Sequence, residues 1–335
     1  MKKLSLFLIG LFLMPSLLLT SCDRGDDLSD GSGSTTPAFS LMKDHMLANN
    51  LDINHILVNA DGAKFVAGAP AEADLQEFLD KYYIIDIRGA ADFAANHIEG
   101  AKNVPVANIL NEAPIAGGQP ILVVCYTGQT ACFATSLLRL SGYSNTQALK
   151  WGMSGWNSAT AGPWNSNIGD PAEGNSNWAY ANATAPSIFG DPDISSFETD
   201  GEVILNNRIE QVLSEGFKGV VATDVLDAPN DYYINNYFSD VDYTGFGHIV
   251  GAYRIKEDLL LATNGYQGLD PDANSVVTYC YTGQTSAVMT AWLRVLGYDA
   301  YSLKFGMNGL YNSNPAWTSN QWSESVSKNL PLISQ

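Results

Sequence analysis

The six-residue sequence CYTGQT occurs twice, at residues 125–130 and again at residues 280–285. Six identical residues of mixed chemical type rarely recur by chance in a chain of 335 residues. Each copy follows a short apolar run, at 121–124 and 276–279, and precedes a segment whose apolar residues have helical spacing. The repeated loop therefore predicts two similar strand–loop–helix units, each with a cysteine where the strand ends.

The loops belong to a longer repeat of four motifs that keep the same order. In the first copy these motifs are HIEGA at 97–101, the loop, LRLSGY at 138–143 and LKWGMSG at 149–155. In the second copy they are HIVGA at 248–252, the loop, LRVLGY at 293–298 and LKFGMNG at 303–309. This order predicts a duplicated domain, with a first domain at 41–165 and a second at 201–335. A linker rich in Asn, Gly, Pro and Ser joins them at 166–200.

The apolar periodicity within each copy is typical of an α/β fold. Runs at 82–87, 121–124 and 276–279 suit buried parallel strands, and residues 131–140 and 286–296 have the spacing of helices that stop before Gly142 and Gly297. We therefore expect two domains, each a parallel sheet flanked by helices. Ligands of open parallel sheets bind at the carboxyl ends of the strands, which is where the two cysteines lie.

The N-terminus has the pattern of a bacterial lipoprotein signal peptide. Lys2 and Lys3 precede an apolar run at 4–19, which closes with Leu19-Thr20-Ser21-Cys22. The pattern predicts removal of residues 1–21, acylation of Cys22 and a flexible tether at 22–40. It places the protein in the cell envelope, anchored to a membrane and facing the periplasm or the cell exterior. The alternative is an ordinary secretory signal with a chance cysteine.

Composition limits the partners and the uses of cysteine. A net charge of −18 argues against binding to nucleic acid, and it leaves the lipid as the means of membrane attachment. Beyond Cys22 there are three cysteines, too few for a disulfide framework, which indicates a chemical role for free thiols. Cys132 lies seven residues after Cys125, and the second copy has Ala287 there. A core role is favoured for Cys132 over that of a resolving thiol.

The loop has the features of a nucleophilic site. Gly128 and Gly283 allow a positive φ, so that successive amide N–H groups converge above the sulfur of Cys125 or Cys280. The N-terminus of the following helix adds positive potential, which favours an anion and a cysteine thiolate of lowered pKa. Cys125 and Cys280 are therefore the predicted catalytic residues. The predicted substrate-binding residues are Tyr126, Thr127, Gly128, Gln129, Thr130 and Lys150, with Tyr281, Thr282, Gly283, Gln284, Thr285 and Lys304.

On these motifs the chain resembles two rhodanese domains, the sulfurtransferase family whose cysteine carries a persulfide. The matching residues of the first copy are Asp86-Ile87-Arg88, Phe93, the HIEGA motif, the Cys125 loop and the LKWG motif near Trp156. The resemblance implies thiosulfate or a persulfide as the small-molecule sulfur donor, and a thiol or cyanide as acceptor, without a metal or organic cofactor. Neither loop has the arginine of many relatives, and the second copy has Asn235-Asn236-Tyr237 near the place of Asp86-Ile87-Arg88.

The flanking residues have less reactive interpretations. Asp86 and Arg88 are expected to form a structural ion pair rather than to bind substrate. His97 and His248 are expected to tie a turn by hydrogen bonds rather than to act as general bases. For Lys150 and Lys304, attraction of an anion and ordinary surface placement remain equally open.

Two other function classes compete with sulfur transfer. Cysteine phosphatases use a similar loop, but they need an arginine to clamp the phosphate where this chain has Ala131 and Ser286. A non-catalytic rhodanese-fold module for binding or sulfur sensing in the envelope stays possible, because a fold does not determine a function. Such a module need not hold a reactive thiolate, whereas a sulfurtransferase must.

Overall fold

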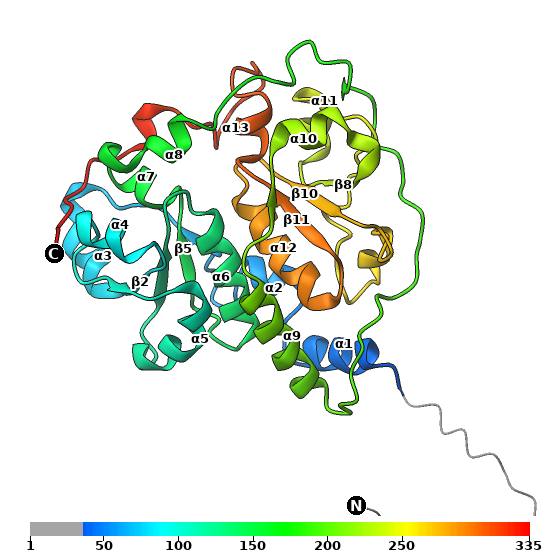
Figure 1. Ribbon diagram of the computed structural model, residues 1–335, viewed down its shortest axis with the longest axis horizontal. Helices are drawn as coiled ribbons and strands as arrows, with labels where there is room; N and C mark the ends of the chain where they lie inside the picture. The colour runs from blue at the N-terminus through cyan, green and yellow to red at the C-terminus, as the bar shows by residue number, and fades with distance from the viewer. Residues whose placement is uncertain (1–35) are drawn as a thin grey trace, which may run out of the picture. The chain divides into compact units, whose positions relative to one another are not determined.

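Two parallel sheets, one in each half of the chain, form the framework of the structure (Figure 1). The computed structural model describes residues 36–335, so the predicted signal peptide, Cys22 and most of the predicted tether lie outside the described residues. The strand order is β1-β5-β4-β2-β3 in the first sheet and β7-β11-β10-β8 in the second. All neighbouring strands in these two sheets run parallel. The predicted α/β class with helix-flanked parallel sheets is confirmed.

The strands are short, and the central ones coincide with the predicted apolar runs. Their bounds are β1 Val66–Ala67, β2 Tyr83–Asp86, β3 Lys102–Asn103, β4 Ile121–Val124, β5 Gln147–Leu149, β6 Trp178–Ala179, β7 Gly219–Val220, β8 Tyr233–Asn236, β9 His248–Ile249, β10 Val276–Tyr279 and β11 Ala300–Leu303. Every residue of β4 and β10 is buried, as expected for strands covered by helices on both faces. β6 and β9 form a separate antiparallel pair.

Helices cover both sheets and occupy the connections between strands (Figure 1). Their bounds are α1 Ala38–Ala48, α2 Ile53–Leu57, α3 Leu75–Lys81, α4 Ala90–Ala95, α5 Ile109–Glu112, α6 Gln129–Leu140, α7 Gly152–Trp156, α8 Gly162–Asn165, α9 Gly201–Glu215, α10 Ala222–Asp227, α11 Asp240–Gly245, α12 Gln284–Leu296 and α13 Gly306–Leu310. The described chain has no helix that is both long enough and apolar enough to cross a membrane.

The two halves meet along α6 and α12, the helices that follow the two cysteine loops. Nearly every residue of both helices is buried, because each packs on its own sheet and on the other helix. Their backbones are close enough for the Ser136 hydroxyl to donate to the carbonyl of Val288 at 3.2 Å. One hydrophobic core therefore runs through both halves and includes Cys125, Cys132 and Cys280.

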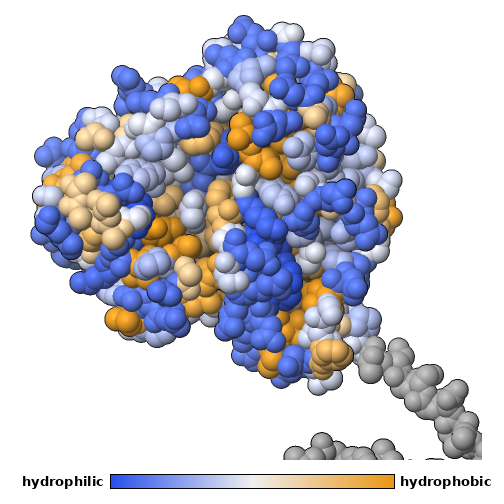
Figure 2. Space-filling model, viewed as in Figure 1, coloured by the Kyte–Doolittle hydropathy of each residue, from blue (hydrophilic) through white to orange (hydrophobic). Residues whose placement is uncertain are grey.

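Each half also holds a terminal segment that belongs to the other half in sequence. α1, at the start of the first half, packs against α9 of the second half. The Asp52 carboxylate, which precedes α2, accepts hydrogen bonds from the backbone N–H groups of Leu261 and Ala262 at 3.0 and 3.1 Å. At the other end, the backbone of Ile333 pairs with that of His97. The outward face of α9 remains hydrophilic (Figure 2).

The predicted linker is irregular over most of its length. Residues 180–200 contain no helix or strand. The start of the linker contacts the second half, because the backbone N–H groups of Gly169 and Ala172 donate hydrogen bonds to the carbonyls of Asn308 and Leu310. The linker thus begins as part of the second half's surface.

Candidate active site

Cys125 follows the central strand β4, and its sulfur faces the backbone of the loop after it. Gly128 has a φ of +82°, which only glycine adopts readily, and this turn starts α6. The amide N–H groups of Gly128 and Ala131 point at Cys125 Sγ, with N to S distances of 3.2 and 3.3 Å. The predicted convergence of amides on the sulfur is therefore present in the first loop.

Cys280 lies in the same place at the end of β10, but one backbone N–H group rather than two points at its sulfur, and a hydroxyl lies nearby. Gly283 has a φ of +76°, and the N–H of Ser286 points at Cys280 Sγ with an N to S distance of 3.4 Å. The Ser286 hydroxyl lies 3.6 Å from the same sulfur and 2.8 Å from the Ser302 hydroxyl. The first loop has Ala131 at this place, so the Cys280 sulfur has an additional polar neighbour.

Burial outweighs the amides in setting the acidity of Cys125. The Cys125 pKa is raised, because burial disfavours the thiolate more than the N–H groups of Ala131, Thr127 and Gly128 favour it. The negative charge of Asp86 raises it further. The lowered pKa expected from the helix N-terminus is therefore wrong for Cys125, since that expectation took no account of a side chain that is only 6% exposed.

A second backbone segment supports each cysteine loop from behind. The N–H of Met153 donates to the carbonyl of Cys125, and the N–H of Met307 donates to that of Cys280, both at 2.9 Å. This approach requires glycine before each methionine. A Cβ at Gly152 would lie 2.3 Å from the Cys125 oxygen, and one at Gly306 would lie 2.1 Å from the Cys280 oxygen. The sequence interpretation missed this support, although the Gly-Met pair in both LKWGM and LKFGM was its signal.

The two loops contact one another through their glutamines. Gln284 donates from Nε2 to the carbonyl of Thr127 at 3.0 Å, and Gln129 Oε1 accepts from the N–H of Phe305 at 2.9 Å. A Cβ at Gly128 would lie 2.4 Å from Gln284 Nε2, and one at Gly283 would lie 2.3 Å from Gln129 Oε1. Both glutamines were expected to bind substrate, and the structure places their side chains on the loop region of the opposite half.

The threonine and tyrosine side chains of the loops form hydrogen bonds within the loops or to neighbouring residues. Thr127 Oγ1 accepts from Gln129 N at 3.4 Å, and Thr282 Oγ1 accepts from Gln284 N at 3.2 Å. The Tyr281 hydroxyl donates to Asp242 Oδ2 at 2.5 Å. Thr130 and Thr285 are half-buried in the first turns of α6 and α12.

Asp86 and Arg88 form a buried ion pair beside the first loop. Arg88 Nη2 lies 2.7 Å from Asp86 Oδ2, and both side chains are almost fully buried. Arg88 also donates to the carbonyl of Asn96 at 2.6 Å, and its guanidinium carbon lies 4.9 Å from the centre of the Tyr126 ring. The pair links β2 to the loop through Tyr126, which agrees with the structural role expected of it.

The second half replaces this ion pair by an amide and an aromatic ring. Pairing with β10 shows that Asn236 corresponds to Asp86, so the equivalent segment is Asn236-Tyr237-Phe238, one residue later than the sequence comparison placed it. Asn236 Oδ1 accepts from Phe238 N at 2.8 Å, as Asp86 Oδ1 accepts from Arg88 N at 2.9 Å. The Phe238 ring stacks on Tyr281 with centroids 4.7 Å apart.

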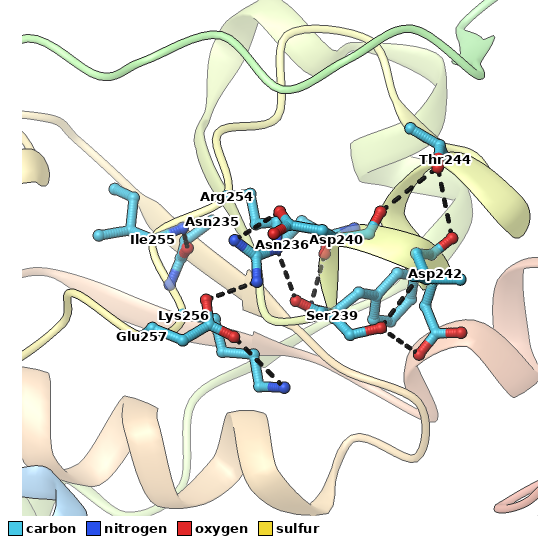
Figure 3. Close-up of polar contacts among 12 residues, drawn as sticks. Asn235, Asn236, Ser239, Asp240, Asp242, Thr244, Arg254, Ile255, Lys256 and Glu257 are labelled. Atoms are coloured by element: carbon cyan, nitrogen blue, oxygen red, sulfur yellow. Dashed lines mark hydrogen bonds and ion pairs between the residues drawn. The ribbon is translucent and has the colours of Figure 1, made fainter.

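Arg254, which lies outside the second loop, forms ion pairs next to the uncharged segment Asn236-Tyr237-Phe238 (Figure 3). Arg254 lies between Asp240, at 2.9 Å, and Glu257, at 2.5 Å. It also donates from Nε to the carbonyl of Phe238 at 2.9 Å. The charge pairing that the first half buries beside its loop is therefore partly exposed in the second half.

The two histidines each close a turn, in agreement with the non-catalytic interpretation. His97 Nδ1 lies 2.8 Å from the Phe93 carbonyl oxygen, and His248 Nδ1 lies 3.1 Å from that of Tyr243, so each Nδ1–H donates. The rings stack on Phe93 and Tyr243 at centroid distances of 3.9 and 3.7 Å. The His248 pKa is lowered by burial, an effect that its hydrogen bond to Tyr243 opposes.

Lys150 and Lys304 lie just beyond the ends of β5 and β11 and line two pockets outside the cysteine loops. Lys150 Nζ donates to Asn320 Oδ1 at 2.9 Å. Its pKa is lowered by burial and by the positive charge of Lys64. No residue of 125–130 or 280–285 is among the lining residues of either pocket.

Cys132 is fully buried in α6, which fits the core role favoured for it. Its pKa is raised well above the usual value, first by burial and then by the charges of Cys125 and Cys280. Among residues 36–335, no group of three or more His, Cys, Asp or Glu side chains is arranged to hold a metal ion.

Comparisons with known proteins identify both halves of this arrangement. The family described as Rhodanese-like domain matches residues 71–159 and 218–313, more than half of the chain, and each match contains one cysteine loop. Thiosulfate sulfurtransferase GlpE of Pseudoalteromonas translucida is 32% identical over 92 residues, which cover 26% of this chain and 86% of that protein. The protein of the same name from Pseudomonas putida is 37% identical over 76 residues, covering 22% of this chain and 67% of that protein.

One of the similar solved structures is the crystal structure of thiosulfate sulfurtransferase from Pseudomonas aeruginosa. It is 15% identical with a TM-score of 0.28, and the match covers 85% of this chain and 49% of that chain. The chain thus spans about half the length of that protein.

Proposed function

Because this chain belongs to the rhodanese-like domain family and carries two such domains, we propose that it is a sulfurtransferase that holds sulfane sulfur on Cys125 and Cys280. The observation that supports this proposal most strongly is that both sulfurs lie at the ends of central strands and face backbone N–H groups: those of Gly128 and Ala131 for Cys125, and that of Ser286 for Cys280. The names of the curated relatives, thiosulfate sulfurtransferases, agree with this class of reaction.

The proposed reaction has two displacement steps on sulfur. A cysteine thiolate attacks the outer sulfur of thiosulfate, forming a cysteine persulfide while the S–S bond of thiosulfate breaks and sulfite leaves with the electron pair. An acceptor thiolate, or cyanide, then attacks the outer sulfur of the persulfide. The cysteine leaves as a thiolate, so the enzyme returns to its first state with no net oxidation.

The amide N–H groups contribute chiefly to the second step. When the acceptor removes the outer sulfur, negative charge returns to Cys125 Sγ, which lies 3.2 and 3.3 Å from the amide nitrogens of Gly128 and Ala131. Donors held in place before the charge develops stabilise it without reorganisation. The same donors oppose the cost of burying the thiolate before it attacks the donor molecule.

Mass spectrometry of the purified protein after incubation with thiosulfate tests this function. We expect a gain of one sulfur atom on Cys125 and on Cys280, and the gain should disappear when cyanide is added. Cys125→Ser and Cys280→Ser should each keep the gain on the remaining cysteine, and the double variant should lose both. Turnover by the double variant would contradict the cysteine mechanism. Binding of sulfur compounds without any gain in mass would instead support the non-catalytic module, which the burial of Cys125 favours.

We also propose that the chain is a lipoprotein of the cell envelope, held to a membrane through acylated Cys22. The support is the sequence of residues 1–22 alone, which lie outside the described residues. Such an anchor would place both cysteine loops where small sulfur compounds of the envelope have access to them.

A further inference from the structure

The two halves carry equivalent pockets beside their cysteine loops. The pocket of the first half has a volume of about 230 Å³ and is lined on one side by Gly68, Ala69, Lys150, Trp151 and Gly155. The pocket of the second half has a volume of about 270 Å³ and is lined by Val221, Ala222, Lys304, Phe305 and Gly309. These residues correspond one to one, because Leu149 and Leu303, just before the lysines, pair with Ala67 and Val220 in the two sheets.

The opposite wall of each pocket comes from the chain that follows the other domain. In the first half this wall is Ser325, Val326 and Lys328, near the C-terminus. In the second half it includes Asn167, Ile168 and Pro171, at the start of the linker. The two pockets therefore share one equivalent side, but their opposite walls differ in residues and in chemistry.

The different walls give the two pockets different charge. The first pocket is lined by two lysines, Lys150 and Lys328, whereas the second is lined by Lys304 alone. None of these three lysines forms an ion pair with any residue between 36 and 335. Neither lining includes an acidic side chain, although Glu324 directly precedes the wall of the first pocket.

Lys150 is available to a ligand in this pocket. Its ammonium group has three N–H donors, and the hydrogen bond to Asn320 uses one of them. Burial and the nearby charge of Lys64 both lower the Lys150 pKa, so a bound anion would relieve an unfavourable environment. The pocket volume is several times the ~30 Å³ that a water molecule occupies in the liquid, which leaves room for a small polyatomic anion.

We propose that the pocket between Lys150 and Lys328 is a binding site for a small oxyanion, and that the equivalent pocket at Lys304 is not. The oxyanion group could belong to an inorganic sulfur compound or to a carboxylate of a thiol acceptor. The site is distinct from the cysteines, but it adjoins the first loop, because Trp151 leads directly into Gly152 behind Cys125. Occupancy would therefore distinguish the first half from the second.

Calorimetric titration of the purified protein with sodium sulfate, and separately with sodium acetate, at constant ionic strength tests the proposal. Neither anion donates sulfur, so the result does not depend on sulfur transfer. We expect one bound anion per chain. Lys150→Met and Lys328→Met keep most of the apolar stem, and each should weaken binding by about tenfold or more through loss of a charged donor. Lys304→Met is the matched control from the equivalent pocket, and Lys102→Met, an exposed lysine of the first half, controls for net charge.

The two titrations separate the sources of the oxyanion. Tighter binding of sulfate would identify an inorganic sulfur compound, and tighter binding of acetate would identify the carboxylate of a larger ligand. The proposal would be overturned if neither anion bound. It would also be overturned if Lys150→Met left the affinity unchanged, or if Lys304→Met weakened binding as much as Lys150→Met did. Thermal unfolding in the presence of the tighter anion gives an independent readout, because a ligand bound only by the folded state raises its Tm.

Discussion

Gly152→Ala tests whether the backbone behind the first loop holds Cys125 in place. The new Cβ would lie 2.3 Å from the Cys125 oxygen, 2.6 Å from the Tyr126 carbonyl carbon and 2.7 Å from the Gly128 nitrogen. All three atoms belong to the backbone, so no side chain can move aside to relieve the contact. The loop that presents two N–H groups to Cys125 Sγ must therefore shift.

The expected cost has two parts, and a second glycine isolates one of them. Placing alanine at a positive φ costs about 1–2 kcal/mol, and forcing atoms into a packed site adds about 1–3 kcal/mol. Gly142→Ala is the matched control, because Gly142 has a φ of +91° and nothing within 4 Å of its Cβ position. We expect Gly142→Ala to lower the free energy of unfolding by about 1–2 kcal/mol and Gly152→Ala by about 2–5 kcal/mol.

Urea denaturation measures the stability difference, and mass spectrometry after thiosulfate measures sulfur loading at each cysteine. Gly152→Ala should lose loading at Cys125 more than at Cys280, which serves as an internal reference. Gly142→Ala should load both cysteines normally. Equal stability of the two variants together with normal loading of Cys125 in Gly152→Ala would refute the reasoning.

Three further predictions concern the coupling of the loops, acidity and anchoring. Gln284→Ala removes the hydrogen bond to Thr127, worth about 1 kcal/mol, and should slow sulfur loading at Cys125 in the opposite half about fivefold; loading kinetics resolved by mass spectrometry would show this, and an unchanged rate at Cys125 would contradict it. In Cys280→Ser, the loading rate should keep rising with pH beyond 9.0, the usual thiol value, because the Cys125 pKa is raised and the thiolate is the attacking form; a pH-rate profile that levels off below 9.0 would argue against this acidity. Cys22→Ala should abolish acylation and release the protein from the membrane fraction, and wild-type protein with an unmodified, soluble N-terminus would disprove the anchor.

The sequence predicts the local architecture around each loop well. The runs at 121–124 and 276–279 coincide with β4 and β10, because a fully buried parallel strand is marked by continuous apolar residues. The helices begin at Gln129 and Gln284, two residues earlier than predicted, since Gly128 and Gly283 serve as their N-caps. Apolar periodicity does not mark the polar first turn of such a helix.

Contacts between distant segments account for most of what the sequence did not predict. Gln129 and Gln284 contact the opposite half, and no local pattern distinguishes such a side chain from one that faces a ligand. The raised pKa of Cys125 comes first from burial, in a hydrophobic core whose members come from both halves, and the loop sequence alone does not reveal that burial. The one-residue error at Asn236 arose because the second copy lacks the Asp and Arg that mark the position in the first.

The exchange of terminal segments also determines what a cut in the linker would do. A protease that cleaves within residues 180–200, where the backbone has no regular structure, would give two fragments. The N-terminal fragment would keep α1, which is packed on α9 of the other fragment. The C-terminal fragment would keep the strand-like contact of Ile333 with His97. The two fragments of the cleaved protein should therefore stay associated and migrate as a single species under native conditions. They should separate only in denaturant.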